Sequence, residues 1–140
     1  MEETIIYYLY NKNLLNEIFL SLKKHRLKSL QDEIMINNEW HEIKNLDDFE
    51  KLACYNKIHC SAYFHIDNNF ITTLIVSFTT DGYLVLGVAL KDCVAIEDFI
   101  SKEEDLLPSC KYIKRMTTTE GMPPKTITGL THEKFCRNLI

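Results

Sequence analysis

The chain of 140 residues lacks the motifs by which common catalytic sites are recognised in a sequence. It contains no glycine-rich dinucleotide or phosphate loop, no serine-nucleophile elbow and no zinc-protease helix motif. Its five cysteines, an odd number, include no Cys-x-x-Cys pair and no Cys/His spacing typical of zinc ligands. These absences predict a protein that is not an enzyme and that holds no metal or other cofactor.

Long apolar runs and a secretory signal segment are also absent. The apolar stretches are much shorter than the roughly 20 residues that a membrane-spanning helix needs. Without a targeting segment, we expect the cysteines to be free thiols in a reducing cytoplasm. The formal net charge of −4 is modest and argues against nucleic acid as the direct partner. The expected location is therefore cytoplasmic, with no membrane contact.

Internal repeats, low-complexity tracts and linkers are missing as well. Hydrophobic residues make up 46% of the chain and charged residues 26%, which is ordinary for a globular domain. A chain of this length can bury a sizeable core. We therefore expect residues 1–140 to form a single domain.

The chain is organised around residues 59–90, which the pattern predicts to be a meander of three antiparallel strands. Residues 59–66, 70–79 and 83–90 are rich in β-branched and aromatic side chains, which favour a pleated surface. Turn-forming residues separate them, namely Asp67, Asn68 and Asn69 in the first turn and Thr80, Asp81 and Gly82 in the second.

The register of this meander follows from the turn lengths. A two-residue second turn would place the apolar residues of its two strands on opposite faces. A three-residue turn with a left-handed Gly82 instead pairs Phe78 with Leu84. The same reasoning pairs Ala62 with Leu74 across the first turn. One face then holds the core, with Thr72 as its only polar member: Cys60, Ala62, Phe64, Ile66, Phe70, Leu74, Val76, Phe78, Leu84, Leu86, Val88 and Leu90.

The other face of the meander, which carries the odd-numbered residues, is mixed in character. Its members are His59, Ser61, Tyr63, His65, Ile71, Thr73, Ile75, Ser77, Tyr83, Val85, Gly87 and Ala89. We expect a helix to cover it, seated over the small residues Gly87 and Ala89, because an apolar surface is rarely left open. The alternative is a binding surface.

The remaining segments predict an α+β fold, in which helices pack on the antiparallel sheet. Apolar residues at helical spacing predict helices at residues 13–28, 47–56 and 94–107. Short alternating or β-branched segments predict further strands at residues 4–10, 31–43 and 110–119, the second of them broken at Asn37 and Asn38. In residues 31–43, we expect Trp40 and Ile43 to act as apolar anchors.

Candidate catalytic residues are few. His59 and His65 lie on one face of one predicted strand, but six residues separate them by roughly 20 Å, too far to share a metal. Cys54 or Cys60 beside a histidine would make a nucleophile–base pair. Cys60, however, falls on the predicted core face, where cysteine behaves as a small hydrophobe.

The acidic face of the helix predicted at 94–107 is the most suggestive feature. It carries Glu97, Asp98, Glu103, Glu104 and Asp105. Such a face can be simply solvated, or it can hold a basic partner by steering its approach and bonding its arginines and lysines. Tyr63 and Tyr83 on the odd face are candidate aromatic anchors, because tyrosine is enriched in binding hot spots.

The layout of residues 40–124 resembles that of known binding proteins. Its elements are Trp40 with Ile43, a helix start at Leu46, Asp47, Asp48 and Phe49, the strand at Ser61, the turn at Asp81, Gly82 and Tyr83, the acidic helix, and the strand and breakers from Tyr112 to Pro124. This layout is similar to that of immunity proteins of bacterial polymorphic toxin systems, including the contact-dependent growth inhibition kind. The resemblance implies binding to one cognate toxin domain, often a nuclease, and neutralisation of it.

Two other classes of function stay open on the sequence. A small-ligand-binding or enzymatic domain could place a pocket over the odd face, lined by His59, Tyr63, His65, Ser77 and Tyr83. A subunit that dimerises through a sheet edge or through the odd face is the third class.

Overall fold

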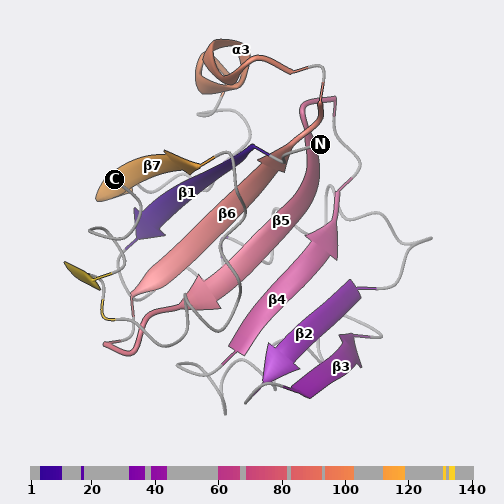
Figure 1. Cartoon of the computed structure of the whole chain (residues 1–140), viewed down its shortest axis with the longest axis vertical. Coiled ribbons are helices and arrows are strands. Elements are labelled where there is room, and N and C mark those ends of the chain that lie inside the picture. Colours follow the sequence, from indigo (N-terminus) through magenta and orange to yellow (C-terminus); the bar gives the residue numbers. More distant parts are fainter. Residues whose placement is uncertain are drawn as a thin grey trace.

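The computed structural model describes residues 4–10, 17, 32–36, 39–43, 60–66, 69–81, 83–92, 94–102, 112–118, 131 and 133–134. Within these ranges the chain forms one seven-stranded sheet in the order β3-β2-β4-β5-β6-β1-β7, and every neighbouring pair is antiparallel (Figure 1). The elements are β1 (Ile5–Tyr10), β2 (Asp32–Ile36), β3 (Glu39–Ile43), β4 (Cys60–His65), β5 (Ile71–Phe78), β6 (Leu84–Leu90), α3 (Ile96–Ile100) and β7 (Lys114–Thr118).

The expected α+β fold is wrong, because the described part of the chain is mainly an antiparallel sheet with one short helix. The segments outside the meander add four strands to the same sheet, β1, β2, β3 and β7. Of the three expected helices, 94–107 is described as a helix only over Ile96–Ile100. The expected helices 13–28 and 47–56 lie outside the described residues, except for Glu17, which is helical.

The N-terminal strand β1 lies inside the sheet, between β6 and β7 (Figure 1). All six of its residues are buried, which fits a run of isoleucine, leucine and tyrosine with no charged member. Ile5 pairs with Ala89 of β6 and with Thr118 of β7. The N-terminal segment therefore joins strands that are distant in sequence.

The predicted register between β5 and β6 is confirmed. Phe78 pairs with Leu84, and the pairing continues along the strands with the same offset as far as Thr73. Thr79 organises the turn between them. Its backbone N–H donates to the carbonyl of Tyr83 (2.9 Å), and its hydroxyl donates to a carboxylate oxygen of Asp81 (2.6 Å). The three-residue connection therefore sets the register, as the apolar pattern requires.

The predicted register between β4 and β5 is wrong by two residues. Ala62 pairs with Val76 instead of Leu74. The backbone N–H of Ile66 donates to the carbonyl of Thr72 (3.1 Å), so the connection between these strands is longer than three residues. Because side chains alternate with a period of two, this shift leaves every side chain on its predicted face.

A β-bulge at the start of β5 changes the faces of two residues. Ile71 pairs with Leu90 while Thr73 pairs with Ala89, so Thr72 is the extra residue. Ile71, predicted on the odd face, is buried with the even-face core. Thr72, predicted as the polar member of that core, is exposed, and its hydroxyl donates to the carbonyl of Ala89 (3.4 Å).

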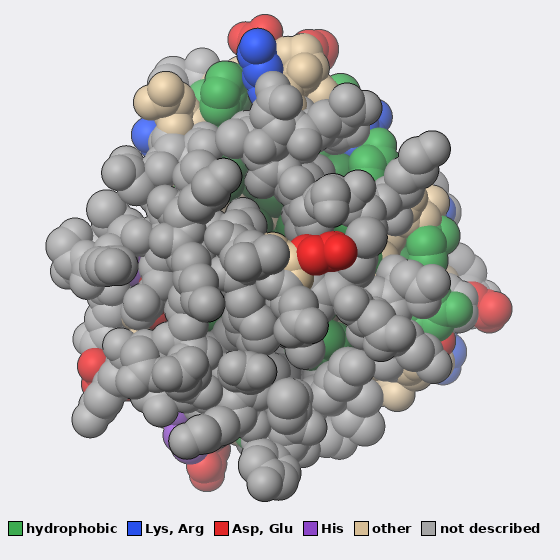
Figure 2. Space-filling view, turned by 180° about the vertical axis from the view of Figure 1, so that it is seen from behind, with side chains coloured by type: hydrophobic (Ala, Val, Ile, Leu, Met, Phe, Trp, Pro, Cys, Tyr) green, Lys and Arg blue, Asp and Glu red, His purple; other side chains and the backbone are tan. Residues whose placement is uncertain are grey.

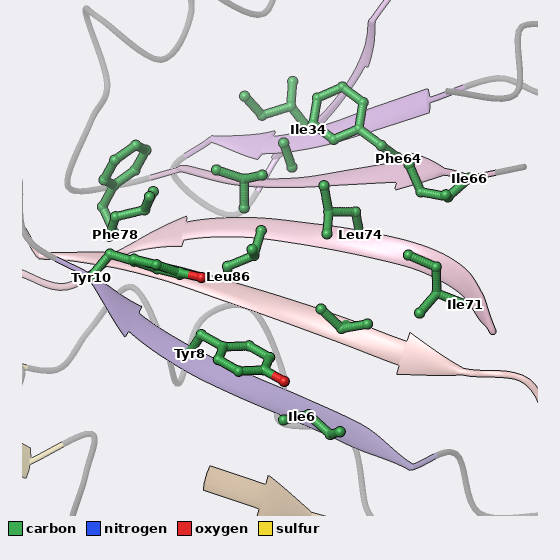
Figure 3. Close-up of a cluster of buried hydrophobic side chains, with 14 of the residues drawn as sticks. Ile6, Tyr8, Tyr10, Ile34, Phe64, Ile66, Ile71, Leu74, Phe78 and Leu86 are labelled. Atoms are coloured by element: carbon green, nitrogen blue, oxygen red, sulfur yellow. The ribbon is translucent and has the colours of Figure 1, made fainter. Parts of the chain in front are cut away.

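Both faces of the sheet carry a buried cluster. The even-face core, part of which is shown in Figure 3, consists of Ile6, Tyr8, Tyr10, Ile34, Ile36, Ile43, Ala62, Phe64, Ile66, Ile71, Leu74, Val76, Phe78, Leu84, Leu86, Val88, Leu90 and Phe99. The odd-face cluster consists of Ile5, Tyr7, Leu9, Ile75, Val85, Ala89 and Met116. Apart from Thr72, the even-numbered meander residues whose side chains are described therefore face the larger core, as predicted.

Helix α3 belongs to the even face. Phe99 is fully buried in the even-face core, and Val94 and Ile96 pack against it half-buried. Glu97 and Asp98 occupy the first turn, where negative charge complements the helix dipole, and both side chains are exposed. The described turn of this helix therefore packs on the even face.

Candidate functional site

The centre of the odd face is closely packed. Tyr7 pairs directly with Gly87, and a Cβ atom added to Gly87 would lie 3.0 Å from Cε1 of Tyr7 and 3.1 Å from Cβ of Ile75. Ile75, Val85 and Ala89 are each at most 5% exposed. The missing side chain at Gly87 therefore makes room for the ring of Tyr7. The helices that could cover this face, at 13–28 and 47–56, lie outside the described residues apart from Glu17.

Ser77, which was predicted to line a pocket, is engaged with another buried serine. Ser61 of β4 and Ser77 of β5 lie directly opposite one another, both fully buried, and their side chains form a hydrogen bond. Such a pair satisfies two polar groups that would be costly to bury alone. Ser77 therefore serves a contact inside the sheet.

The other residues predicted for a pocket are spread out. His59 lies outside the described residues. Tyr63 pairs with Ile75, which pairs with Gly87, so Tyr63 is level with the middle of β6. Tyr83 comes four residues before Gly87 in the chain, which is about 13 Å along a strand. The structure places these two tyrosines against the odd-face cluster at different heights.

His65 contributes a backbone contact at the end of β4. Its N–H donates to Oδ1 of Asp32 (3.0 Å), a carboxylate that is fully buried. Asp32 pairs with Ile43 of β3, and the next residue, Glu33, pairs with Tyr63 of β4. Asp32 therefore lies at the end of β2, between β3 and β4. The buried carboxylate thus tethers two strands, which is a structural role.

The predicted acidic helix face is described only in part. Glu97 and Asp98 are exposed on α3, while Glu103, Glu104 and Asp105 lie outside the described residues. Helix α3 follows the last residue of β6, whereas Tyr83 precedes its first, so the two features lie beyond opposite ends of that strand (Figure 1). Tyr83 and the described acidic residues of α3 do not form one patch.

A different surface gathers exposed aromatic and acidic side chains. Trp40 of β3 is 52% exposed, and its ring centroid lies 5.6 Å from that of Tyr63, with an interplanar angle of 54°. Trp40 pairs with Met35, whereas Tyr63 pairs with Glu33. The indole therefore reaches diagonally across β2, beside Glu33, to contact the tyrosine ring.

Two carboxylates complete this surface. Glu33 pairs directly with Glu42 across β2 and β3, and both are exposed. Directly paired residues of neighbouring strands project from the same face, so Glu33, Trp40, Glu42 and Tyr63 all lie on the odd face. We call these four residues the Trp40 patch. No ion pair of either glutamate occurs among the described residues.

The Trp40 patch lies at an edge of the described sheet. Strand β3 ends the strand order, and its first four residues are exposed. In the reverse view, carboxylates and a histidine appear at the lower left margin, where the rotation brings the β3 edge (Figure 2). The opposite edge strand, β7, carries Lys114 and Arg115. The two ends of the described sheet therefore differ in charge.

Sequence reasoning named Tyr63 but missed the rest of the patch. Trp40 was expected to act as an apolar anchor with Ile43, yet only Ile43 is buried. The sequence of residues 39–42, Glu-Trp-His-Glu, could have indicated that this segment is exposed. Charged residues stand on both faces of this segment, which is typical of an edge strand.

Comparison with models of protein families, with curated proteins and with solved structures finds no significant match for this chain. In the described ranges, no helix is both long and apolar enough to cross a membrane. Nor do three or more His, Cys, Asp or Glu side chains gather as metal ligands in that part of the chain. The chemistry of the Trp40 patch is therefore what indicates a function.

Proposed function

We propose that the protein is an immunity protein, which binds a basic domain of a cognate bacterial toxin in the cytoplasm and neutralises it without catalysis. The observation that carries this proposal is the half-exposed indole of Trp40, which packs on Tyr63 beside the two exposed carboxylates of Glu33 and Glu42. Tryptophan and tyrosine are the side chains most enriched in binding hot spots. The carboxylates supply complementarity to a basic surface and accelerate its approach.

The rest of the chain supports a binding role. Its net charge is −4, and the sequence has no motif of a catalytic site. Glu97 and Asp98 add exposed negative charge on α3, and the layout of residues 40–124 resembles that of immunity proteins. A nuclease domain, whose substrate is polyanionic, is a basic target that such a protein would block.

The test is protection of cells from the toxin encoded by the neighbouring gene. The C-terminal domain of that toxin is expressed alone or together with this protein, and survival and co-purification are measured. We expect the wild-type protein to protect, and Trp40→Ala to weaken binding by about 2 kcal/mol, as truncation of a hot spot does.

The matched control is Ile113→Ala. Ile113 is also a large exposed hydrophobic residue, 58% exposed, but it lies beside β7. Its truncation should leave protection unchanged. A metabolic operon in place of a toxin gene, or equal losses in the two variants, would contradict the proposal.

A further inference from the structure

Glu33 and Glu42 stand directly opposite each other on β2 and β3, and such a pair of like charges is unfavourable unless a cation lies nearby. Directly opposed residues of antiparallel strands have Cβ atoms about 5 Å apart, and like charges at that spacing destabilise a sheet. Both side chains are exposed, and no described cation neutralises them. The basic residues of β7 lie at the other end of the strand order. A cation placed between the two carboxylates would therefore relieve the repulsion.

The aromatic half of the patch specifies the shape of that cation. The indole of Trp40 is steadied by its contact with Tyr63 while about half of its surface stays open. A guanidinium group is planar, stacks on aromatic rings and carries five N–H donors, enough to bond two carboxylates at once. An ammonium group is a compact, strongly hydrated point charge that does not match a flat ring flanked by two acceptors.

We propose that the Trp40 patch is the docking surface for one arginine side chain of a basic protein partner. The guanidinium group stacks on the indole of Trp40 and donates hydrogen bonds to Glu33 and Glu42. This inference rests on the proposed function, which supplies a basic toxin domain as the partner. The inference names the chemical group that the Trp40 patch recognises. On the partner, that group belongs to an arginine and not to a lysine.

The patch carries its own reporter, because Trp40 is the only tryptophan of the chain. The full-length protein is titrated with the peptide acetyl-Gly-Arg-Gly-amide and, separately, with acetyl-Gly-Lys-Gly-amide. Indole fluorescence and the indole N–H resonance of Trp40 are followed. We expect a saturable response that is stronger for the arginine peptide. Glu33→Gln and Glu42→Gln should each weaken arginine binding about two- to fivefold, as expected for an exposed ion pair.

The control variant is Glu97→Gln, which removes the same charge from α3. It should leave arginine binding unchanged at fixed ionic strength. Equal responses to the two peptides, or equal weakening by the Glu33 and Glu97 variants, would refute arginine docking and leave only a general attraction of cations. A dimer seen by ultracentrifugation, dissociated by Glu42→Gln while the peptides have no effect, would assign the surface to a second copy of the chain and overturn the proposal.

The titration uses no toxin, so its result is separate from that of the protection assay. Protection without an arginine response refutes the arginine anchor and leaves the immunity function standing. An arginine response without protection keeps the docking chemistry and removes the toxin as its partner. Denaturant unfolding of each glutamine variant shows that the fold is intact, because removal of one of two opposed charges should not lower stability.

Discussion

Substitution of Gly87 by alanine tests how β1 and β6 pack on the odd face. The new Cβ atom would lie 3.0 Å from Cε1 of Tyr7, 3.1 Å from Cβ of Ile75 and 3.3 Å from Cδ1 of Tyr7. These distances are shorter than the roughly 3.5–4.0 Å at which carbon atoms attract each other best. The ring of Tyr7 can tilt, but Cβ of Ile75 is fixed to the backbone of β5 and can move only with its strand.

The expected magnitude is the difference between two effects. Overpacking of a core costs about 1–3 kcal/mol. Alanine is favoured over glycine within a strand by roughly 0.5–1 kcal/mol, because glycine loses more conformational freedom on folding. Taking the middle of each range, we expect Gly87→Ala to lower the free energy of unfolding by about 1 kcal/mol.

Urea unfolding of the wild-type protein and the variant measures this change as a shift of the midpoint at constant slope. The same substitution in a Tyr7→Ala background supplies the control, because two of the three close contacts are then absent. In that background, Gly87→Ala should lower the free energy of unfolding by less, and the difference between the two losses is the coupling energy between positions 7 and 87. A neutral or stabilising Gly87→Ala, or an unchanged penalty without the tyrosine ring, would refute the packing argument.

Three further substitutions test other contacts. Ser61→Ala should cost about 1–3 kcal/mol, because it leaves the hydroxyl of Ser77 buried without its partner, whereas the double alanine variant should be closer to wild type; equal costs in urea unfolding would contradict this. Phe99→Ala should cost about 3–5 kcal/mol in the same assay, because the ring is fully buried, and a loss below 1 kcal/mol would show that α3 is not docked. Glu42→Gln should stabilise the free protein by about 0.2–1 kcal/mol at low salt, and the gain should fade as salt screens the repulsion; a loss of stability would contradict an unfavourable Glu33–Glu42 pair.

The candidate site could be predicted only in fragments. Tyr63 was identified because it stands on the mixed odd face of the meander. Glu33, Trp40 and Glu42 belong to a separate segment, and they meet Tyr63 only because β2 pairs with both β3 and β4. No local pattern specifies these pairings, since several strands of similar composition could have taken the same places. Tyr83 and the acidic helix were both predicted to contact the partner, but Tyr83 and the described residues of α3 lie beyond opposite ends of β6.

Local sequence was sufficient wherever a short-range rule applied. The two-residue period of a strand determined which meander residues face the larger core. The turn around Asp81 determined the register of β5 and β6, since a shift by one residue would have exposed an entire apolar face. A shift by two residues exposes nothing, and the β4–β5 register was therefore not determined by the same pattern.

Only the tertiary structure decided what depends on partners distant in sequence. The place of β1 between β6 and β7 is such a case, because it pairs Ile5 with Ala89 and with Thr118. The bulge that moves Ile71 into the core is another, since it depends on how β5 meets Leu90. The exposure of Trp40 is the third. Ile43 of the same strand is buried, so exposure in β3 depends on the face that a residue occupies and on what packs against that face, which its neighbours in the sequence do not specify.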